Sequence, residues 1–347
     1  MLADRFEVVI GVDTHKDTHT AVVVAAATGA VLGEVTVPAD RGGFTQLVSV
    51  ADGHGLKRVW AVEGTGSYGA GLCRFLSGRG ETVVEIARPL RRRGRRRGKS
   101  DALDAVEAAR EALHRPHQAQ PRTGAERAAL AELLAVRRAA VDAARVAQLQ
   151  LHALVIKAPE EVRARFDHQS TTAMVNTATR LRVPGGADIH TATTVKLMRA
   201  LARRYRTLRS EAADHHAALE QIVRRWRPDL LERPGVGPIV AATVLCAWSH
   251  PGRCRNEAAF ASLAGVAPLP ASSGNTVRHR LNRGGDRQLN QALHTVVLVR
   301  LRRHPATLEY VNKRRGQGMT GPEIRRCLSR YIARELYRQL EQPLDRT

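Results

Sequence analysis

The sequence has no run of apolar residues long enough to cross a membrane. A spanning helix needs about 18 or more such residues, and the chain of 347 residues contains no run of that length. The first residues also lack the basic, apolar and small-residue regions of a signal peptide. These absences argue against a membrane protein, and we expect a cytoplasmic protein with no membrane partner.

Cysteine is also scarce. Small secreted proteins held together by disulfides have many more cysteines for their length, and a zinc ribbon needs paired ones. The sequence therefore indicates neither a disulfide framework nor a structural zinc site. Its four cysteines lie far apart and form no Cys-x-x-Cys pair: Cys73, Cys246, Cys254 and Cys327.

Negative charge is in short supply, with 33 acidic residues against 55 lysines and arginines and a net charge of +22. An excess of this size is normally tolerated because a polyanion neutralises it, so nucleic acid is the predicted partner. Only six of the basic residues are lysines. The planar arginine side chain suits phosphate contacts, although a GC-rich genome would explain the arginine preference equally well.

The N-terminal part shows an α/β pattern. Three β-branched runs predict a strand and a hairpin, and a helix, a strand, a helix and a last strand follow. This order is that of an RNase H-like sheet, which we predict for a domain over residues 1–124. The expected elements are Glu7–Val12, Thr20–Ala26, Val31–Pro38, Gly43–Ala51, Arg58–Val62, Tyr68–Leu76 and Thr82–Ala87.

Four acidic residues occupy positions that such a fold brings together. Asp13 closes the first strand and Glu63 the fourth, which are neighbours in an RNase H-like sheet. Asp101 and Asp104 share one face of the helix that Ser100 caps. Crowded carboxylates raise each other's pKa unless divalent cations lie between them, so we predict a catalytic Mg²⁺ site for phosphodiester cleavage. His15 and Lys16, which closely follow Asp13 in the sequence, can contact phosphate or belong to a surface loop.

A strongly basic segment directly precedes Asp101. Residues 88–99 contain eight basic groups and no acidic one, so they cannot bury apolar area. We predict a loop that nucleic acid orders; a merely solvated run is the alternative. The expected nucleic-acid-binding residues are Arg91, Arg92, Arg93, Arg95, Arg96, Arg97 and Lys99.

Residues 125–228 are predicted to be a helical region with a coiled coil. Between residues 197 and 226 the apolar positions follow one another at steps of three and four, as in a heptad repeat. Such a seam leaves an apolar stripe unless another helix covers it, so we expect a homo-oligomer, either a dimer or a tetramer. The seam residues are Leu197, Leu201, Tyr205, Leu208, Ala212, His215, Leu219, Ile222 and Trp226.

A mainly α-helical domain is predicted over residues 229–347. The stretch PGVGP, followed by the apolar run Ile239–Leu245, indicates a helix-hairpin-helix. In that motif Gly235 and Gly237 allow a tight turn that presents backbone amides to a phosphate. An ordinary connection between helices is the alternative.

The same domain contains two adjacent serines, Ser272 and Ser273, in a turn-forming stretch that precedes several arginines. A serine among cationic groups can attack phosphorus, because these groups stabilise the alkoxide and the charged transition state. Ser-Ser-Gly is also an ordinary turn sequence. The expected nucleic-acid contacts in this stretch are Arg278, Arg280 and Arg283.

Together these stretches resemble the DEDD insertion-sequence transposases, also called bridge-RNA-guided recombinases, over nearly the whole chain. The motifs that carry the resemblance are GVDTHK, AVEGTGSYG, KSDALDA, RPGVGPIVAATVL, FASLAGVAPLP, SSG and RLNRGGDRQLNQAL. The resemblance implies a RuvC-like domain whose carboxylates hold Mg²⁺, a coiled coil that assembles protomers, and a transposase domain with a nucleophilic serine. The family's Ser-Gly pattern falls on Ser273, which would form a phosphoserine link to DNA, with Ser272 as the alternative. The resemblance also implies a structured guide RNA that pairs with donor and target DNA.

We therefore predict a transposase or recombinase that cuts and rejoins DNA and associates with the nucleoid when active. One alternative is a RuvC-like structure-specific nuclease that does not rejoin strands, and the serine domain weighs against it. Another is a non-catalytic architectural DNA-binding protein, against which the four placed carboxylates argue. An actin-like ATPase would need a second such domain and a Gly-rich adenosine loop, and the sequence after residue 115 shows neither.

Overall fold

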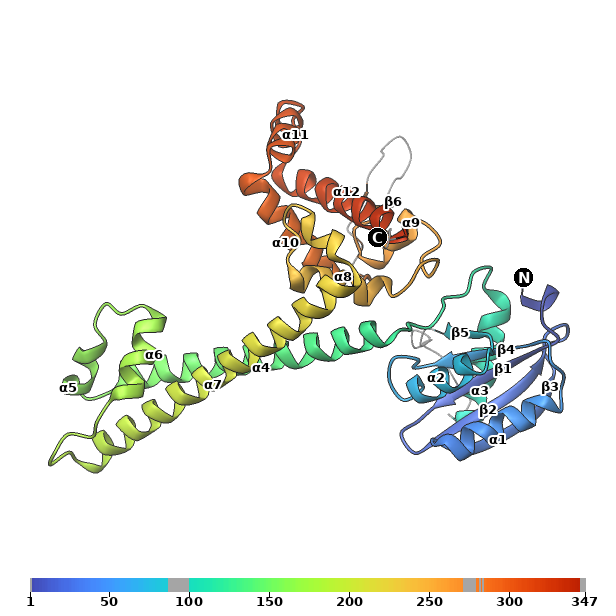
Figure 1. Cartoon of the computed structure of the whole chain (residues 1–347), viewed down its shortest axis with the longest axis horizontal. Coiled ribbons are helices and arrows are strands. Elements are labelled where there is room, and N and C mark those ends of the chain that lie inside the picture. Colours follow the sequence, from blue (N-terminus) through green and yellow to red (C-terminus); the bar gives the residue numbers. More distant parts are fainter. Residues whose placement is uncertain (1, 87–99, 271–278, 281, 283, 344–347) are drawn as a thin grey trace. The chain divides into compact units, whose positions relative to one another are not determined.

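The computed structural model describes residues 2–86, 100–270, 279–280, 282 and 284–343 (Figure 1). The chain forms two compact units. The first contains Met1–Gly124 and Ser249–Cys254, and the second contains Ala125–Trp248 and Arg255–Thr347. The predicted helical region and the predicted transposase domain thus lie mostly within one unit. Among the described residues, no helix is long and apolar enough to span a membrane.

The first unit is built on a five-stranded sheet with the strand order β3-β2-β1-β4-β5. Its elements are β1 (Val8–Thr14), β2 (Thr18–Ala25), β3 (Val31–Pro38), α1 (Arg41–Asp52), β4 (Arg58–Glu63), α2 (Ala70–Gly78), β5 (Val83–Ile86) and α3 (Asp101–His114). Strand β1 is antiparallel to β2 and parallel to β4. This mixed sheet, followed by a mostly helical chain, fits the RNase H-like fold that the sequence predicts.

The two faces of the sheet are covered by different helices. Side chains alternate between the faces along a strand. Ile10 and Val12 of β1 therefore pack in one core cluster with residues of α1 and α2, whereas Val9 belongs to a second cluster with residues of α3. Both clusters are apolar, which explains why β1 and β4 read as nearly continuous hydrophobic runs.

Helix α3 approaches β1 closely because Gly11 has no side chain. A Cβ atom at Gly11 would lie 1.9 Å from the carbonyl oxygen of Ala105 and 2.8 Å from the backbone nitrogen of Ala109. The buried face of α3 consists of alanines, so the helix backbone itself packs against the strand. This contact determines where the first residues of α3 lie relative to the end of β1.

A short segment from the later sequence completes the first unit. Ser249 is buried and has a positive φ of 73°, so the chain turns sharply there. Its Oγ accepts a hydrogen bond from the backbone N–H of Thr123 at 3.0 Å and donates one to the Thr123 carbonyl oxygen at 3.2 Å. These contacts tie the segment to the stretch that follows α3.

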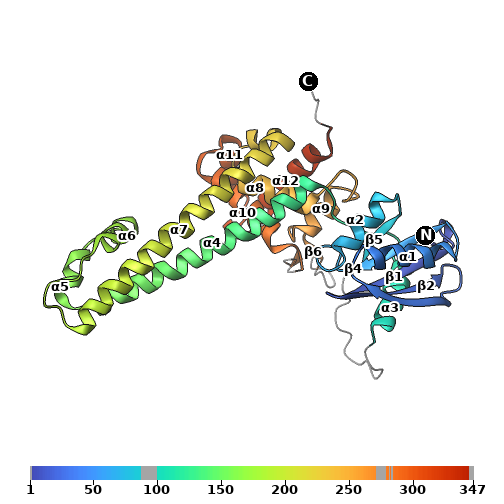
Figure 2. The same ribbon diagram turned by 60° about the horizontal axis from the view of Figure 1, so that its bottom comes forward.

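Two long helices dominate the second unit. Helices α4 (Ala125–Lys157) and α7 (Ile189–Trp226) run side by side, with α5 (Glu160–Arg163), a 3₁₀ turn (Ala164–Phe166) and α6 (Thr171–Arg180) between them in sequence (Figure 1, Figure 2). One apolar cluster joins Leu151 of α4, Phe166, Met174 of α6 and Met198 of α7. The chain therefore covers much of α7 with its own residues.

The predicted heptad seam coincides only in part with the buried residues of α7. Ala212 and Leu219 are buried, but Leu197 is 49% exposed. Near the start of α7 the buried residues are instead Val195 and Met198, because α4 and α6 pack on that side. At this end of the helix the seam residue Leu197 is thus not covered within one chain, and the predicted coiled coil between protomers stays a prediction.

The remaining helices of the second unit pack against α8 or against one another. They are a 3₁₀ helix (Pro228–Glu232), α8 (Pro238–Trp248), α9 (Glu257–Leu263), α10 (Arg287–Arg303), α11 (Pro305–Gly316) and α12 (Gly321–Glu341), with the short strands β6 (Leu269–Pro270) and β7 (His279–Arg280). The element before the PGVGP turn is thus a 3₁₀ helix. Gly235 has a positive φ of 82°, and a Cβ atom there would lie 3.2 Å from the Val296 carbonyl oxygen, so the turn requires glycine.

Candidate metal-binding active site

Asp13 and Glu63 lie at the C-terminal ends of two adjacent parallel strands. Strands β1 and β4 pair in a register that ends with Val12 opposite Val62, and the two acidic residues come next. Val9 and Gly11 face α3, so by alternation Asp13 faces α3 as well. Ala61 faces the same side, which places Glu63 there too. The sheet topology thus brings both carboxyl-bearing residues to one edge and one face.

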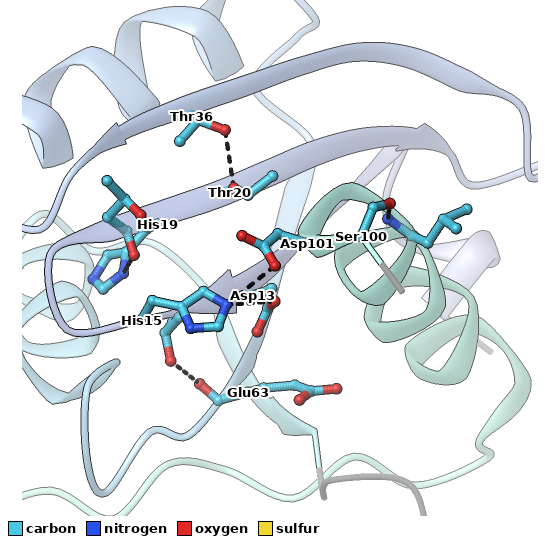
Figure 3. Close-up of polar contacts among 11 residues, drawn as sticks. Asp13, His15, His19, Thr20, Thr36, Glu63, Ser100 and Asp101 are labelled. Carbon is cyan, nitrogen blue, oxygen red and sulfur yellow. Dashed lines mark hydrogen bonds and ion pairs between the residues drawn. The ribbon is translucent and has the colours of Figure 1, made fainter. Parts of the chain in front are cut away.

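Helix α3 adds Asp101 to this edge (Figure 3). Asp101 is the first residue of α3, and the Oγ of Ser100 caps the helix by accepting a hydrogen bond from the backbone N–H of Leu103. The predicted cap is therefore confirmed. Because α3 packs closely on β1, its N-terminus lies beside Asp13.

Asp13, Asp101 and His15 form a close group whose potential ligand atoms all lie within 4.8 Å of one another. The Nε2 atom of His15 is 3.1 Å from Oδ2 of Asp13 and 3.4 Å from Oδ1 of Asp101. Carboxylate oxygens and an imidazole nitrogen are the donors that divalent cations use in proteins. The residues present therefore fit a bound divalent metal ion.

Glu63 and Asp104 lie outside this close group of described residues. Figure 3 shows Glu63 near Asp13 and His15, and Thr14 Oγ donates a hydrogen bond to the Glu63 carbonyl oxygen at 3.0 Å. Asp104 is half-buried on α3, and three residues of helix separate its Cα from that of Asp101 by a rise of about 4.5 Å. The structure thus brings two of the four predicted carboxylates together, whereas Glu63 lies at the end of the neighbouring strand β4 and Asp104 lies three residues further along α3.

The turn after Glu63 depends on a glycine. Gly64 has a positive φ of 63°, and a Cβ atom there would lie 3.0 Å from Oγ of Thr14 and 3.1 Å from Oγ of Ser67. A larger residue would strain this turn. The Gly in AVEGTG therefore helps to hold the ends of β1 and β4 together.

His15 is the residue that sequence reasoning did not include among the ligands. It comes two positions after Asp13, and its backbone N–H donates to the Thr18 carbonyl oxygen at 3.0 Å, which extends the strand pairing past the end of β1. An extended chain places residues i and i+2 on the same face. The Asp-x-His spacing at a strand end is therefore the sequence signal that would have identified His15 as a possible ligand.

His19, in the same stretch, has a different environment. It is fully buried and its ring stacks on Phe44, with 5.6 Å between the ring centroids. Burial lowers the pKa of His19, which favours the neutral ring. Since Phe44 belongs to the core cluster on the α1 and α2 side of the sheet, His19 packs on the face opposite Asp13.

Several predicted site residues lie outside the described residues, namely Arg91, Arg92, Arg93, Arg95, Arg96, Arg97, Lys99, Ser272, Ser273, Arg278 and Arg283. Of the others, Arg280 is exposed in β7, and Gly235 and Gly237 directly precede the N-terminus of α8. Their roles stay predictions.

Two family models match the chain, and together they span more than half of it. Residues 10–158 match a transposase model of the DEDD IS110 type, and residues 228–312 match a model described as the transposase IS116/IS110/IS902 family. The first match includes Asp13, Glu63, Asp101 and Asp104, and the second includes the PGVGP turn.

Two proteins of insertion elements are similar to the chain. An uncharacterized 42 kDa protein of insertion element IS900 from Mycobacterium paratuberculosis is 27% identical over an alignment of 367 positions, which covers 89% of each chain. An uncharacterized 43.6 kDa protein of insertion element IS110 from Streptomyces coelicolor is 32% identical over 114 residues, which cover 33% of this chain and 28% of that protein.

The order of the two matches agrees with the order of the structural elements. The DEDD match begins in β1 and extends through α4, whereas the second match begins in the 3₁₀ helix before the PGVGP turn and ends in α11. Transposases cut and rejoin DNA, and the DEDD type is typically metal-dependent. The chain therefore belongs to the IS110/IS116 family of insertion-element transposases.

Proposed function

We propose that this chain is a metal-dependent DNA transposase whose N-terminal carboxylates bind the Mg²⁺ used for strand cleavage and rejoining. The observation that carries the proposal is the convergence of Asp13, Asp101 and His15 beside the paired ends of β1 and β4. A bound Mg²⁺ ion polarises a scissile phosphate and stabilises the oxygens that attack and leave. Such an ion requires oxygen ligands, which this edge of the sheet supplies.

The exposure of the three side chains suits a site that meets a large substrate. The Asp13 side chain is 12% exposed, whereas those of His15 and Asp101 are 41% and 50% exposed. Asp13 is therefore the anchored ligand, and the solvent side of the group is open to a phosphodiester. Glu63 and Asp104 complete the proposed set of four carboxylates from the end of β4 and the next turn of α3.

We further propose that Ser273 is the nucleophile, with Ser272 as the alternative. The serine oxygen forms an ester with a DNA phosphorus while the deoxyribose oxygen leaves and takes up a proton, and rejoining reverses this step with another strand. The neighbouring Arg278, Arg280 and Arg283 support the assignment, because their charges stabilise the developing negative charge.

The nucleic-acid partners follow from charge and family. The net charge of +22 favours binding of a polyanion, and we propose donor DNA, target DNA and a structured guide RNA encoded by the element. The basic segment 88–99 and the N-terminus of α8, preceded by Gly235 and Gly237, are the proposed phosphate contacts. Assembly into a dimer or tetramer through the exposed side of α7 completes the proposal.

A cleavage assay with an Asp13→Ala variant tests the metal site. The substrate is DNA that carries the element's ends, with RNA transcribed from the noncoding sequence that flanks the gene. Loss of even a residue that merely orients a metal ligand costs roughly 10–100-fold, so we expect Mg²⁺-dependent cleavage to fall at least about a hundredfold. Asp17→Ala is the matched control, because Asp17 is exposed and its side chain lies outside the close group. Unchanged cleavage by Asp13→Ala would refute the proposed site.

A denaturing gel that detects protein bound covalently to DNA tests the serine. Ser273→Ala should abolish the adduct and Ser272→Ala should leave it. The reverse result assigns the reaction to Ser272. Cleavage without any adduct or rejoined product in the unmodified protein would indicate the nuclease alternative instead.

A further inference from the structure

The ring of His15 lies between two carboxylates that come from different elements. Its Nε2 atom is 3.1 Å from an Asp13 oxygen and 3.4 Å from an Asp101 oxygen. Two ligand atoms that are each about 2.1 Å from one ion, and at right angles to each other, are about 3 Å apart. Both separations are therefore close to those between neighbouring ligands of a single ion.

The backbone holds His15 in this position. Its N–H donates to the Thr18 carbonyl oxygen at 3.0 Å, and the preceding residue, Thr14, donates through Oγ to the Glu63 carbonyl oxygen at 3.0 Å. His15 is thus bound to β2 on one side and its neighbour to β4 on the other. A ligand whose backbone is held in this way needs little reorganisation to bind an ion.

The ring is also accessible. The side chain of His15 is 41% exposed, so an ion and its remaining water ligands can reach the nitrogen without unfolding of the strand end. Buried His19, four residues later, packs on the opposite face of the sheet and has no such access.

We propose that His15 is a third protein ligand of the metal, and that its nitrogen shifts the preference of the site toward first-row transition ions such as Mn²⁺, relative to Mg²⁺. Mg²⁺ takes oxygen ligands and keeps much of its water. Imidazole nitrogen suits the later first-row ions best, and Mn²⁺, which also takes carboxylate oxygens, accepts it more readily than Mg²⁺ does. This inference rests on the proposed metal site of Asp13 and Asp101 and adds a ligand that determines which ion it prefers.

Electron spin echo spectroscopy of Mn²⁺ bound to the full chain tests the proposal directly. Mn²⁺ is paramagnetic, and a directly bound histidine nitrogen modulates its echo. We expect this nitrogen signal in the unmodified protein, its change when histidine is labelled with ¹⁵N, and its loss in His15→Gln. Titration with Mn²⁺ alone should show binding weakened at least about tenfold in His15→Gln, with a smaller change for Mg²⁺ measured by competition. His117→Gln is the matched control, because His117 is an exposed residue of the same unit outside the close group.

Two other outcomes separate this inference from the proposed function. If Asp13→Ala abolishes Mn²⁺ binding but the unmodified protein shows no nitrogen signal, His15 is not a ligand and the carboxylate site still stands. If Asp13→Ala binds Mn²⁺ as well as the unmodified protein does, the proposed metal site itself is wrong. The spectrum of the unmodified protein decides the role of His15 even if His15→Gln does not fold.

Discussion

Replacement of Gly11 by alanine tests how the fold positions the carboxylates. The added Cβ would lie 1.9 Å from the Ala105 carbonyl oxygen, where ordinary contacts are 3.4–4 Å. Both the strand and the helix present backbone atoms at this point, so no flexible side chain can move aside. Helix α3 must therefore retreat by roughly 1.5 Å for the core to accept the methyl group.

This displacement has two expected consequences. Overpacking of a close-packed core costs about 1–3 kcal/mol of stability. Asp101 lies one helical turn before Ala105 and moves with the helix, away from Asp13. A misplacement of about 1 Å in an active site costs on the order of a hundredfold in rate, so we expect Gly11→Ala to reduce cleavage by about that factor at temperatures where it is still folded.

Thermal unfolding followed by circular dichroism, together with the Mg²⁺-dependent cleavage assay, measures both effects. Gly78→Ala is the matched control, because Gly78 ends α2 and a Cβ atom there meets nothing within 4 Å. Alanine also favours a helix over glycine by up to about 1 kcal/mol, so this variant should be at least as stable as the unmodified protein. If Gly11→Ala keeps both its stability and its cleavage rate, α3 does not position Asp101 through this contact.

Two further predictions concern stability. Glu81 accepts hydrogen bonds from the buried Arg58, and these bonds lower the pKa of Glu81 from the ordinary 4.5. The charged Glu81 side chain therefore stabilises the fold fully above about pH 4.5. This contribution is lost as the pH falls through the lowered pKa of the folded state. Glu81→Gln should cost roughly 3 kcal/mol at neutral pH and flatten the acid side of the curve of melting temperature against pH, and a curve of unchanged shape would contradict this. Leu219 is fully buried in the second unit whereas Leu197 is 49% exposed, so Leu219→Asp should lower stability by about 3 kcal/mol or more and Leu197→Asp by less than about 0.5 kcal/mol. Chemical denaturation measures both, and light scattering of Leu197→Asp shows whether the exposed side of α7 joins protomers, in which case the particle mass falls.

Local patterns in the sequence predicted the sheet because they depend on neighbouring residues only. The runs that end near Asp13 and Glu63 are continuous and apolar, as expected for strands buried on both faces, and the strand order β3-β2-β1-β4-β5 fits the predicted fold. The capping serine before Asp101 was equally local, because its side chain bonds to a backbone amide three residues later. These signals are independent of the rest of the chain.

The helical region shows what local sequence patterns do not predict. Spacing identified α7 as a long helix with apolar positions, but it did not say which residues would cover them. Val195 and Met198 are buried because α4 and α6, from elsewhere in the sequence, pack on that side, whereas Leu197 stays exposed. A periodic pattern in the sequence specifies an apolar stripe on a helix. Which element covers that stripe depends on residues far away in the sequence.

The sequence by itself determined which residues face the same side of each element, and so which carboxylates were candidates for one site. Only the tertiary structure decided which of them meet. Asp13, Asp101 and His15 converge because Gly11 and the alanine face of α3 allow close packing, and because the chain past β1 continues its pairing with β2. Alternation and helical periodicity fix direction, but the distance between side chains depends on how closely separate elements pack.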